Sequence, residues 1–228
     1  MADTIVLVGA SRGIGAAAAT HLAPRTRRLI GVSRTRAAAG DWLAADVATD
    51  EGVAAVTAAV GDGPLDALLF LGGVWEAGAF TDAYRFLDSP PEEIRHVIAV
   101  NLVAPILLAR ALAPALARAT SPRIVLIGSL SGRDGGATAE VANTASKFGL
   151  RGAAQALDIA LAPLGIAATV VNPGNVATAD VEADIAEGRF ADQTPVPLAD
   201  LMAMLDLVLA LSPAASAREI DLAQTQPG

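Results

Sequence analysis

The sequence predicts a doubly wound α/β fold, with a mostly parallel sheet and helices on both faces. Apolar runs of strand length alternate along the chain with segments of helical period. These apolar runs are almost continuous, as is typical of strands in parallel sheets that crossover helices bury on both faces. The length of 228 residues fits one domain spanning residues 1–228.

The N-terminal half contains four of the expected strands. Thr4–Val8 (TIVLV) is a continuous apolar run, and a glycine-rich turn separates it from an alanine-rich helix over about Gly13–Leu22. The other expected strands are Arg28–Ser33, 42–46 and 65–71, and a second helix is expected to close at residues 54–60. This repeated strand–helix order is what favours a doubly wound sheet.

The C-terminal half continues the same alternation. A long helix is expected over 91–116, where Pro91 suits the first turn and Pro105 implies a bend. The remaining elements are strands at Arg123–Ile127, 166–171 and Glu219–Leu222, and helices at 142–161 and 198–211.

Two long segments, 72–89 and 177–197, are expected to be loops. Both follow strands at the edge where open α/β sheets bind ligands, so each is a candidate for substrate binding. Ordinary surface loops are the equally weighted alternative.

Composition excludes several classes of function. A net charge of −8 and a pI near 4.7 disfavour a nucleic-acid or anionic-membrane surface. The absence of cysteine excludes disulfides and thiolate chemistry, and two histidines alone disfavour a metal site. The N-terminus lacks a basic signal segment, and proline and glycine interrupt the uncharged stretch 159–179. We therefore expect a soluble cytoplasmic protein without nucleic-acid, membrane or metal partners.

A glycine-rich turn follows the first expected strand directly, with the sequence Gly9-Ala10-Ser11-Arg12-Gly13-Ile14-Gly15. Glycines in such a turn permit a sharp bend, close approach of a pyrophosphate, and tight packing of helix on strand. The helix that follows offers free N–H groups and a positive dipole end to phosphate. The strand–turn–helix context predicts a Rossmann-type dinucleotide site in preference to a plain tight turn. The candidate cofactor contacts are Gly9, Ser11, Arg12, Gly13, Ile14 and Gly15.

The end of the second strand bears on the choice between NAD and NADP(H). An NAD-selective site usually carries an acidic residue there for the ribose 2′-hydroxyl. This chain has Ser33-Arg34-Thr35 instead. Arg34 and Arg12 are placed to hold a 2′-phosphate by charge-assisted hydrogen bonds, which favours NADP(H). The alternative is that both arginines are solvated loop charges.

These features resemble the short-chain dehydrogenase/reductase family, and the resemblance extends along nearly the whole chain. The GxxxGxG spacing of the glycine turn is similar to the family's pattern. Asp46 and Val47 fall where the family's Asp contacts the adenine ring. Asn101 matches the family's active-site asparagine in the middle of a helix.

Two further segments resemble family motifs, one that meets the nicotinamide side of the cofactor and one that supports the adenosine ribose. One is similar to the family's PGxxxT segment, and its matching residues are Pro173, Gly174, Val176 and Thr178. The family's NNAG motif is here Phe70-Leu71-Gly72-Gly73, so both asparagines are replaced while Gly72 and Gly73 still permit close backbone approach.

The resemblance also implies a catalytic group and reveals a substitution in it. In this family a tyrosine exchanges the proton of the substrate oxygen, a lysine four residues later lowers its pKa and holds the nicotinamide ribose, and a serine binds the carbonyl. Ser129 and Lys147 match the serine and the lysine, which makes Asn143 the tyrosine position. An amide has no proton to exchange at accessible pH. The implied catalytic group is Asn101, Ser129, Asn143 and Lys147, with non-standard proton delivery.

The proton donor is left open between two candidates. Tyr84 is the only tyrosine and lies on the 72–89 segment, so it is a candidate replacement acid. Packing of the loop is the favoured interpretation of Tyr84. A water molecule held by Asn143 and Lys147 is the other candidate.

Three functions follow from this pattern. The first is an NADP(H)-dependent oxidoreductase acting on a small carbonyl or alcohol substrate. The second is an NADPH-binding sensor or interaction protein without turnover, and the third is isomerase or lyase chemistry on the same scaffold. The resemblance further implies a homodimer or homotetramer formed through the helices at 91–116 and 142–161.

Overall fold

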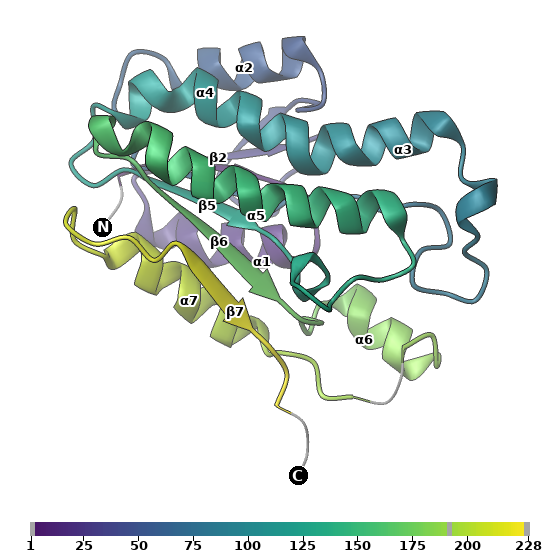
Figure 1. Cartoon of the computed structure of the whole chain (residues 1–228). Coiled ribbons are helices and arrows are strands. Elements are labelled where there is room, and N and C mark those ends of the chain that lie inside the picture. The colour runs from purple at the N-terminus through teal and green to yellow at the C-terminus, as the bar shows by residue number, and fades with distance from the viewer. Residues whose placement is uncertain (1–2, 191–192, 226–228) are drawn as a thin grey trace.

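One parallel sheet contains every strand of the part of the chain described, which is residues 3–190 and 193–225 of a computed structural model (Figure 1). The strand order is β3-β2-β1-β4-β5-β6-β7, and each neighbouring pair is parallel. The strands are β1 (Thr4–Val8), β2 (Arg28–Ser33), β3 (Asp41–Ala44), β4 (Ala67–Phe70), β5 (Arg123–Ile127), β6 (Ala167–Pro173) and β7 (Glu219–Leu222).

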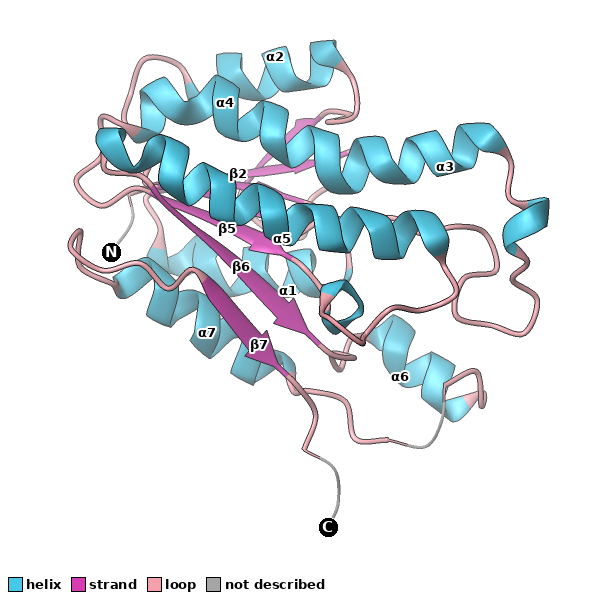
Figure 2. Cartoon of the chain, in the orientation of Figure 1, coloured by secondary structure: helices cyan, strands magenta, loops and turns pink. Residues whose placement is uncertain are grey.

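Helices cover both faces of this sheet, which confirms the predicted doubly wound fold. On one face lie α2 (Asp50–Val60), α3 (Pro91–Ile98), α4 (Ala104–Leu116) and α5 (Val141–Leu161). On the other lie α1 (Gly13–Leu22) and α7 (Leu198–Ala210) (Figures 1 and 2). The short helix α6 (Ala179–Ala186) stands beyond the carboxyl ends of the strands.

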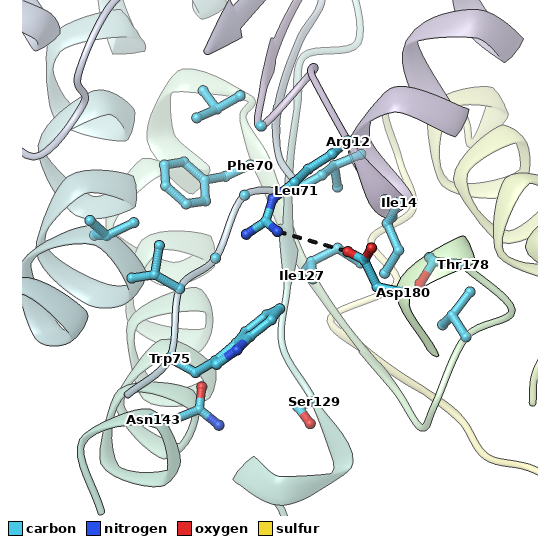
Figure 3. Close-up of a pocket in the computed structure, with 18 of the residues that line it drawn as sticks. Arg12, Ile14, Phe70, Leu71, Trp75, Ile127, Ser129, Asn143, Thr178 and Asp180 are labelled. Atoms are coloured by element: carbon cyan, nitrogen blue, oxygen red, sulfur yellow. Dashed lines mark ion pairs between the residues drawn. The ribbon is translucent and has the colours of Figure 1, made fainter. Parts of the chain in front are cut away.

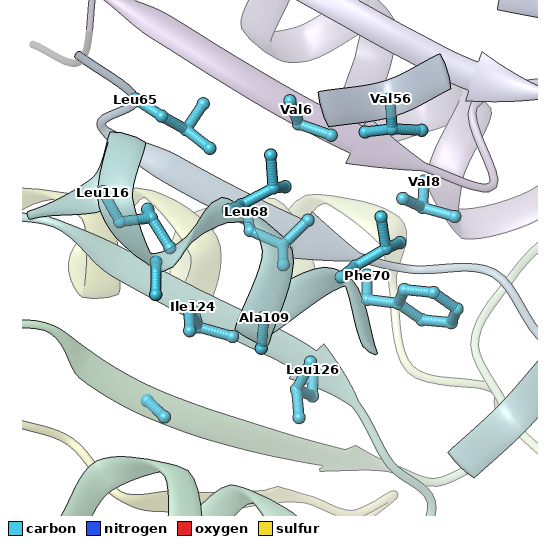
Figure 4. Close-up of a cluster of buried hydrophobic side chains, with 14 of the residues drawn as sticks. Val6, Val8, Val56, Leu65, Leu68, Phe70, Ala109, Leu116, Ile124 and Leu126 are labelled. Atoms are coloured by element: carbon cyan, nitrogen blue, oxygen red, sulfur yellow. The ribbon is translucent and has the colours of Figure 1, made fainter. Parts of the chain in front are cut away.

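The core consists of two apolar clusters separated by the sheet. Successive side chains of a strand point to opposite faces, so Val6 and Val8 of β1 join one cluster while Ile5 and Leu7 join the other. Figure 4 shows the first cluster, in which Leu68 of β4 joins Val56 of α2 and Leu116 of α4. Burial on both faces explains why the central strands β1, β4 and β5 are almost continuously apolar.

Many element boundaries are those predicted, the others differ by one to four residues, and α6 is a larger difference. The helix predicted to close at 54–60 begins at Asp50, because the Thr49 hydroxyl accepts the Gly52 N–H (3.0 Å) and caps it. The segment predicted as a loop at 177–197 contains α6, which buries none of its residues and so has no apolar period to detect. Residues 191 and 192 of that segment lie outside the described residues.

The helix predicted over 91–116 is continuous, but its irregularity lies before Pro105. A π-helical turn spans Ala99–Val103 between α3 and α4. Pro105 has no N–H to donate to the carbonyl of Asn101, so the regular hydrogen-bond ladder is interrupted there. By length and hydropathy this run is long enough to cross a membrane, but Leu108, Leu112 and Leu116 pack in the core, as in a buried helix of this fold.

Gly52 provides a test of how closely α2 approaches the loop that carries Asp46. Replacing a helical glycine with alanine ordinarily stabilises a helix by about 0.5–1 kcal/mol. Here an added Cβ would lie 1.8 Å from the Asp46 carbonyl oxygen. We therefore expect Gly52→Ala to lower the free energy of unfolding by about 1–3 kcal/mol in urea titrations. Gly63→Ala is the matched control, because an added Cβ meets no atom within 4 Å there. Equal stability of the two variants would contradict the close approach.

Candidate functional site

A cavity of about 390 Å³ opens at the carboxyl ends of β1 and β4 (Figure 3). Chain connections run from β1 toward β2 on one side, while β4 pairs with β1 on the other. The loops leaving β1 and β4 therefore diverge, and the gap between them is where open α/β sheets bind ligands. The fold thus places the cavity where the sequence predicts a nucleotide site.

Two glycines let the backbone close tightly at this point. Gly9 has φ +90°, and a Cβ on it would lie 2.5 Å from the backbone of Gly72. Gly15 lies behind the same turn, where a Cβ would be 2.1 Å from the Gly9 carbonyl oxygen. Any side chain at these positions would push the loops or α1 apart.

The structure brings nearly all the predicted site residues to this one cavity. The predicted residues that line it are Gly9, Ser11, Arg12, Gly13, Ile14, Arg34, Asp46, Val47, Gly72, Gly73, Ser129, Asn143, Lys147, Pro173, Gly174, Val176 and Thr178. Gly15 and Asn101 do not line the cavity. Gly15 instead packs α1 against the glycine turn.

Asn101 lies behind the cavity wall. Its side-chain oxygen accepts the Val74 N–H (2.9 Å), and its nitrogen donates to the Val74 carbonyl (2.7 Å) and to the Ser146 hydroxyl (3.2 Å). The side chain is therefore fully used in pinning the loop after β4 to α5. This makes Asn101 a positioning residue, in contrast to its predicted membership of the catalytic group.

The two arginines of the predicted phosphate site lie at the mouth of the cavity. Arg34 is exposed at the end of β2. Arg12 forms an ion pair with Asp180 of α6 (3.8 Å), and its guanidinium lies 5.8 Å from the centre of the Trp75 ring. Both charges are solvent-accessible and close to the glycine turn, so they are free to reorient toward an anion.

Ser129 is oriented by a neighbour that sequence reasoning missed. Its hydroxyl oxygen accepts hydrogen bonds from the Ser131 N–H (3.1 Å) and the Ser131 hydroxyl (2.9 Å). With these bonds accepted, the Ser129 hydrogen remains available to donate into the cavity. A serine in a turn carries no sequence signal for this role.

Lys147 and Asn143 lie one helical turn apart on α5. The Lys147 Nζ donates to the Ile127 carbonyl (3.0 Å), and burial lowers the pKa of this ammonium from 10.5 to about 8. The Asn143 side-chain amide lines the cavity and makes no hydrogen bond within the described part of the chain. Its donor and acceptor are therefore available to a ligand or water (Figure 3).

Tyr84 occupies a structural position. It is buried, it does not line the cavity, and its hydroxyl accepts the Val141 N–H at the start of α5 (3.4 Å). The favoured interpretation of Tyr84 as a loop anchor therefore has geometric support.

Comparisons with known proteins identify the family of the chain. Residues 3–188 match the short chain dehydrogenase family. The short chain dehydrogenase ausX of Penicillium brasilianum is 30% identical over 82% of this chain and 73% of its own length. The ketoacyl reductase HetN of a Nostoc species is 33% identical over 79% of this chain and 66% of its own. A metagenomic short-chain oxidoreductase solved with NADP superposes with a TM-score of 0.77 at 27% identity, covering 99% of this chain and 98% of that one.

Burial of Lys147 predicts a trade-off between stability and the site. We expect Lys147→Met to raise the free energy of unfolding by roughly 1–3 kcal/mol at pH 7, because the buried ammonium is held at a lowered pKa. The folded chain releases the Lys147 proton near pH 8 and the unfolded chain near 10.5. The difference from wild type is therefore full below pH 8 and shrinks as the pH rises toward 10.5.

Urea titrations between pH 7 and pH 10 measure this difference. Arg110→Met is the matched control, because Arg110 is an exposed cation on α4 and its loss changes stability by only about 0.5 kcal/mol. A Lys147→Met protein no more stable than wild type at pH 7 would show that the bond to Ile127 outweighs desolvation.

Proposed function

Because the chain belongs to the short-chain dehydrogenase family, we propose that it is an NADP(H)-dependent oxidoreductase that interconverts a carbonyl and an alcohol without a catalytic tyrosine. The observation that carries the proposal is the convergence of Ser129, Asn143 and Lys147 on the cavity that begins at the glycine turn. A carbonyl substrate is consistent with the relative named as a ketoacyl reductase.

The shape and charge of the cavity fit a dinucleotide. Gly13 has φ +53°, and a Cβ there would meet only the Thr178 methyl group, at 4.0 Å, so the turn presents bare backbone to the cavity. Arg12 and Arg34 would hold a 2′-phosphate, and Asp46 with Val47 would border the adenine. When bound, NADPH supplies the hydride. The NADP in the 27% identical solved structure supports this choice of cofactor.

The chain's own residues account for binding the carbonyl and moving its proton. Ser129 donates its free hydroxyl hydrogen to the carbonyl oxygen. Asn143 holds a water molecule through its unpaired amide. As the carbonyl is reduced, this water gives a proton to the developing alkoxide and takes one from the Lys147 ammonium, whose pKa of about 8 suits proton exchange near neutral pH.

The cofactor preference is tested at the end of β2. We expect Arg34→Glu to weaken NADPH binding by about 10- to 100-fold, because it replaces a charge-assisted contact with repulsion. NADH binding should change by less than about threefold, since NADH lacks the 2′-phosphate. Titration of cofactor fluorescence measures both. Arg36→Glu is the matched control, because Arg36 is exposed nearby but does not line the cavity. Equal loss of NADPH and NADH binding would overturn the assignment.

Asn143 is tested by assaying NADPH oxidation over a panel of carbonyl compounds. We expect wild-type turnover that Asn143→Tyr does not improve, and a loss of about 10²-fold in kcat for Asn143→Leu, which cannot hold the water. Ala145→Ser, at an exposed position of the same turn that does not line the cavity, should retain turnover.

The opposite result distinguishes the other functions. If the wild-type protein does not oxidise NADPH but the Asn143→Tyr variant does, an NADPH-binding sensor is favoured. Conversion of a substrate without net consumption of NADPH would favour isomerase or lyase chemistry.

A further inference from the structure

Three aromatic rings form one wall of the cavity at its substrate end. The chain has only two Trp, one Tyr and five Phe, yet Trp75, Phe80 and Phe190 stand together here. The rings of Trp75 and Phe80 are 6.1 Å apart edge to face, and those of Phe80 and Phe190 are 6.4 Å apart. We call these three residues the aromatic wall. In a chain this poor in aromatics, such a concentration on a cavity points to a ligand with a flat apolar surface.

The central ring of the aromatic wall is held in a strained conformation. Phe80 has φ +62°, the only positive φ among the described residues other than glycine. The buried Glu140 carboxylate accepts the Phe80 N–H (2.8 Å) and so fixes this backbone. Residues with side chains rarely adopt this conformation, and they keep it only where the surroundings enforce it. Here it places the ring between Trp75 and Phe190.

A second buried carboxylate fixes the wall relative to Asn143. One oxygen of Glu76 accepts the N–H groups of Ala142 (2.7 Å) and Asn143 (3.2 Å) in the first turn of α5. Glu76 directly follows Trp75, so the ring and the amide are tied to the same turn. Figure 3 shows Trp75, Asn143 and Ser129 around the same part of the cavity. The backbone that carries Trp75 and Phe80 is therefore fixed next to the groups proposed to bind the carbonyl.

The charge around the wall selects against an anionic ligand. Asp180 and Asp184 of α6 both line this end of the cavity. Asp184 is paired with Arg189, and Asp180 would lose its partner Arg12 when Arg12 holds the 2′-phosphate, so the net field there is not positive. A neutral ring is the ligand that this combination accepts.

We propose that the substrate is a neutral aryl ketone or aldehyde, or the matching aryl alcohol, whose ring packs on the aromatic wall while its oxygen reaches Ser129 and Asn143. The contact of the substrate oxygen with Ser129 and Asn143 rests on the proposed function. The contact of the substrate ring rests on the aromatic wall alone, so an experiment can contradict either one without the other.

Phe80→Gly is the sharpest variant, because glycine adopts the positive φ without strain. We expect it to fold with a melting temperature no lower than about that of wild type, and to lose selectivity for rings. Wild type should favour acetophenone over cyclohexyl methyl ketone by about tenfold in kcat/KM, and Phe80→Gly should reduce this ratio to near one. Phe190→Leu should reduce it as well, which preserves the test if Phe80→Gly does not fold. Phe86→Leu, at an exposed position of the same loop outside the cavity, should leave the ratio unchanged.

A binding measurement separates the two proposals. Trp42→Phe leaves Trp75 as the sole tryptophan, so its fluorescence reports on the wall. We expect 1-phenylethanol to change this fluorescence saturably, 1-cyclohexylethanol to bind about tenfold more weakly, and Phe80→Gly to abolish the difference. Ring-selective binding without turnover would support the wall and overturn the proposed function. Turnover without ring preference in either measurement would overturn the aryl substrate.

Discussion

The close approach of three backbone segments at the carboxyl end of β1 is the constraint on which the rest of this structure depends. Gly9 lies against the loop that leaves β4, and Gly15 of α1 lies directly beneath the Gly9 carbonyl. With side chains at these positions, β1 and β4 could not pair up to their ends while α1 starts immediately beyond. The cavity is the space left where these loops diverge, so its position follows from the strand order.

Two of the three proposed catalytic side chains lie on a single helix. Asn143 and Lys147 lie one turn apart on α5, and three contacts hold the first turn of that helix: Glu76, the Tyr84 hydroxyl and the Glu140 bond to the loop. The loop after β4 thus acts as both a wall of the cavity and a clamp on α5. Burial of Lys147 has two consequences. It lowers the pKa of the ammonium, which suits proton exchange, and it is expected to reduce the free energy of unfolding for the same reason.

The sequence alone predicts the structure where a local pattern determines it. Continuous apolar runs identify the strands, and the glycine turn locates the nucleotide end of the cavity. The sequence does not predict which polar side chains are buried where the burial arises from contacts between distant segments. Glu76 and Glu140 look like solvated loop carboxylates, and only folding brings them to the N–H groups of Ala142, Asn143 and Phe80. Phe190 joins Phe80 in the same way, from far along the chain.

The π-helical turn at Ala99–Val103 restricts how this protein can change in length. The π-helical turn accommodates one residue more than a regular turn and leaves the flanking helices in register, whereas deleting a residue from the regular turns of α3 would rotate its start relative to α4 by about 100°. Glu93 of α3 would then leave the loop after β4, where it accepts the Ala77 N–H (2.8 Å). Substitutions on the exposed side of this run keep the register of the helix, whereas a single-residue insertion or deletion in its regular turns does not. Evolution along this stretch is therefore freer in composition than in length.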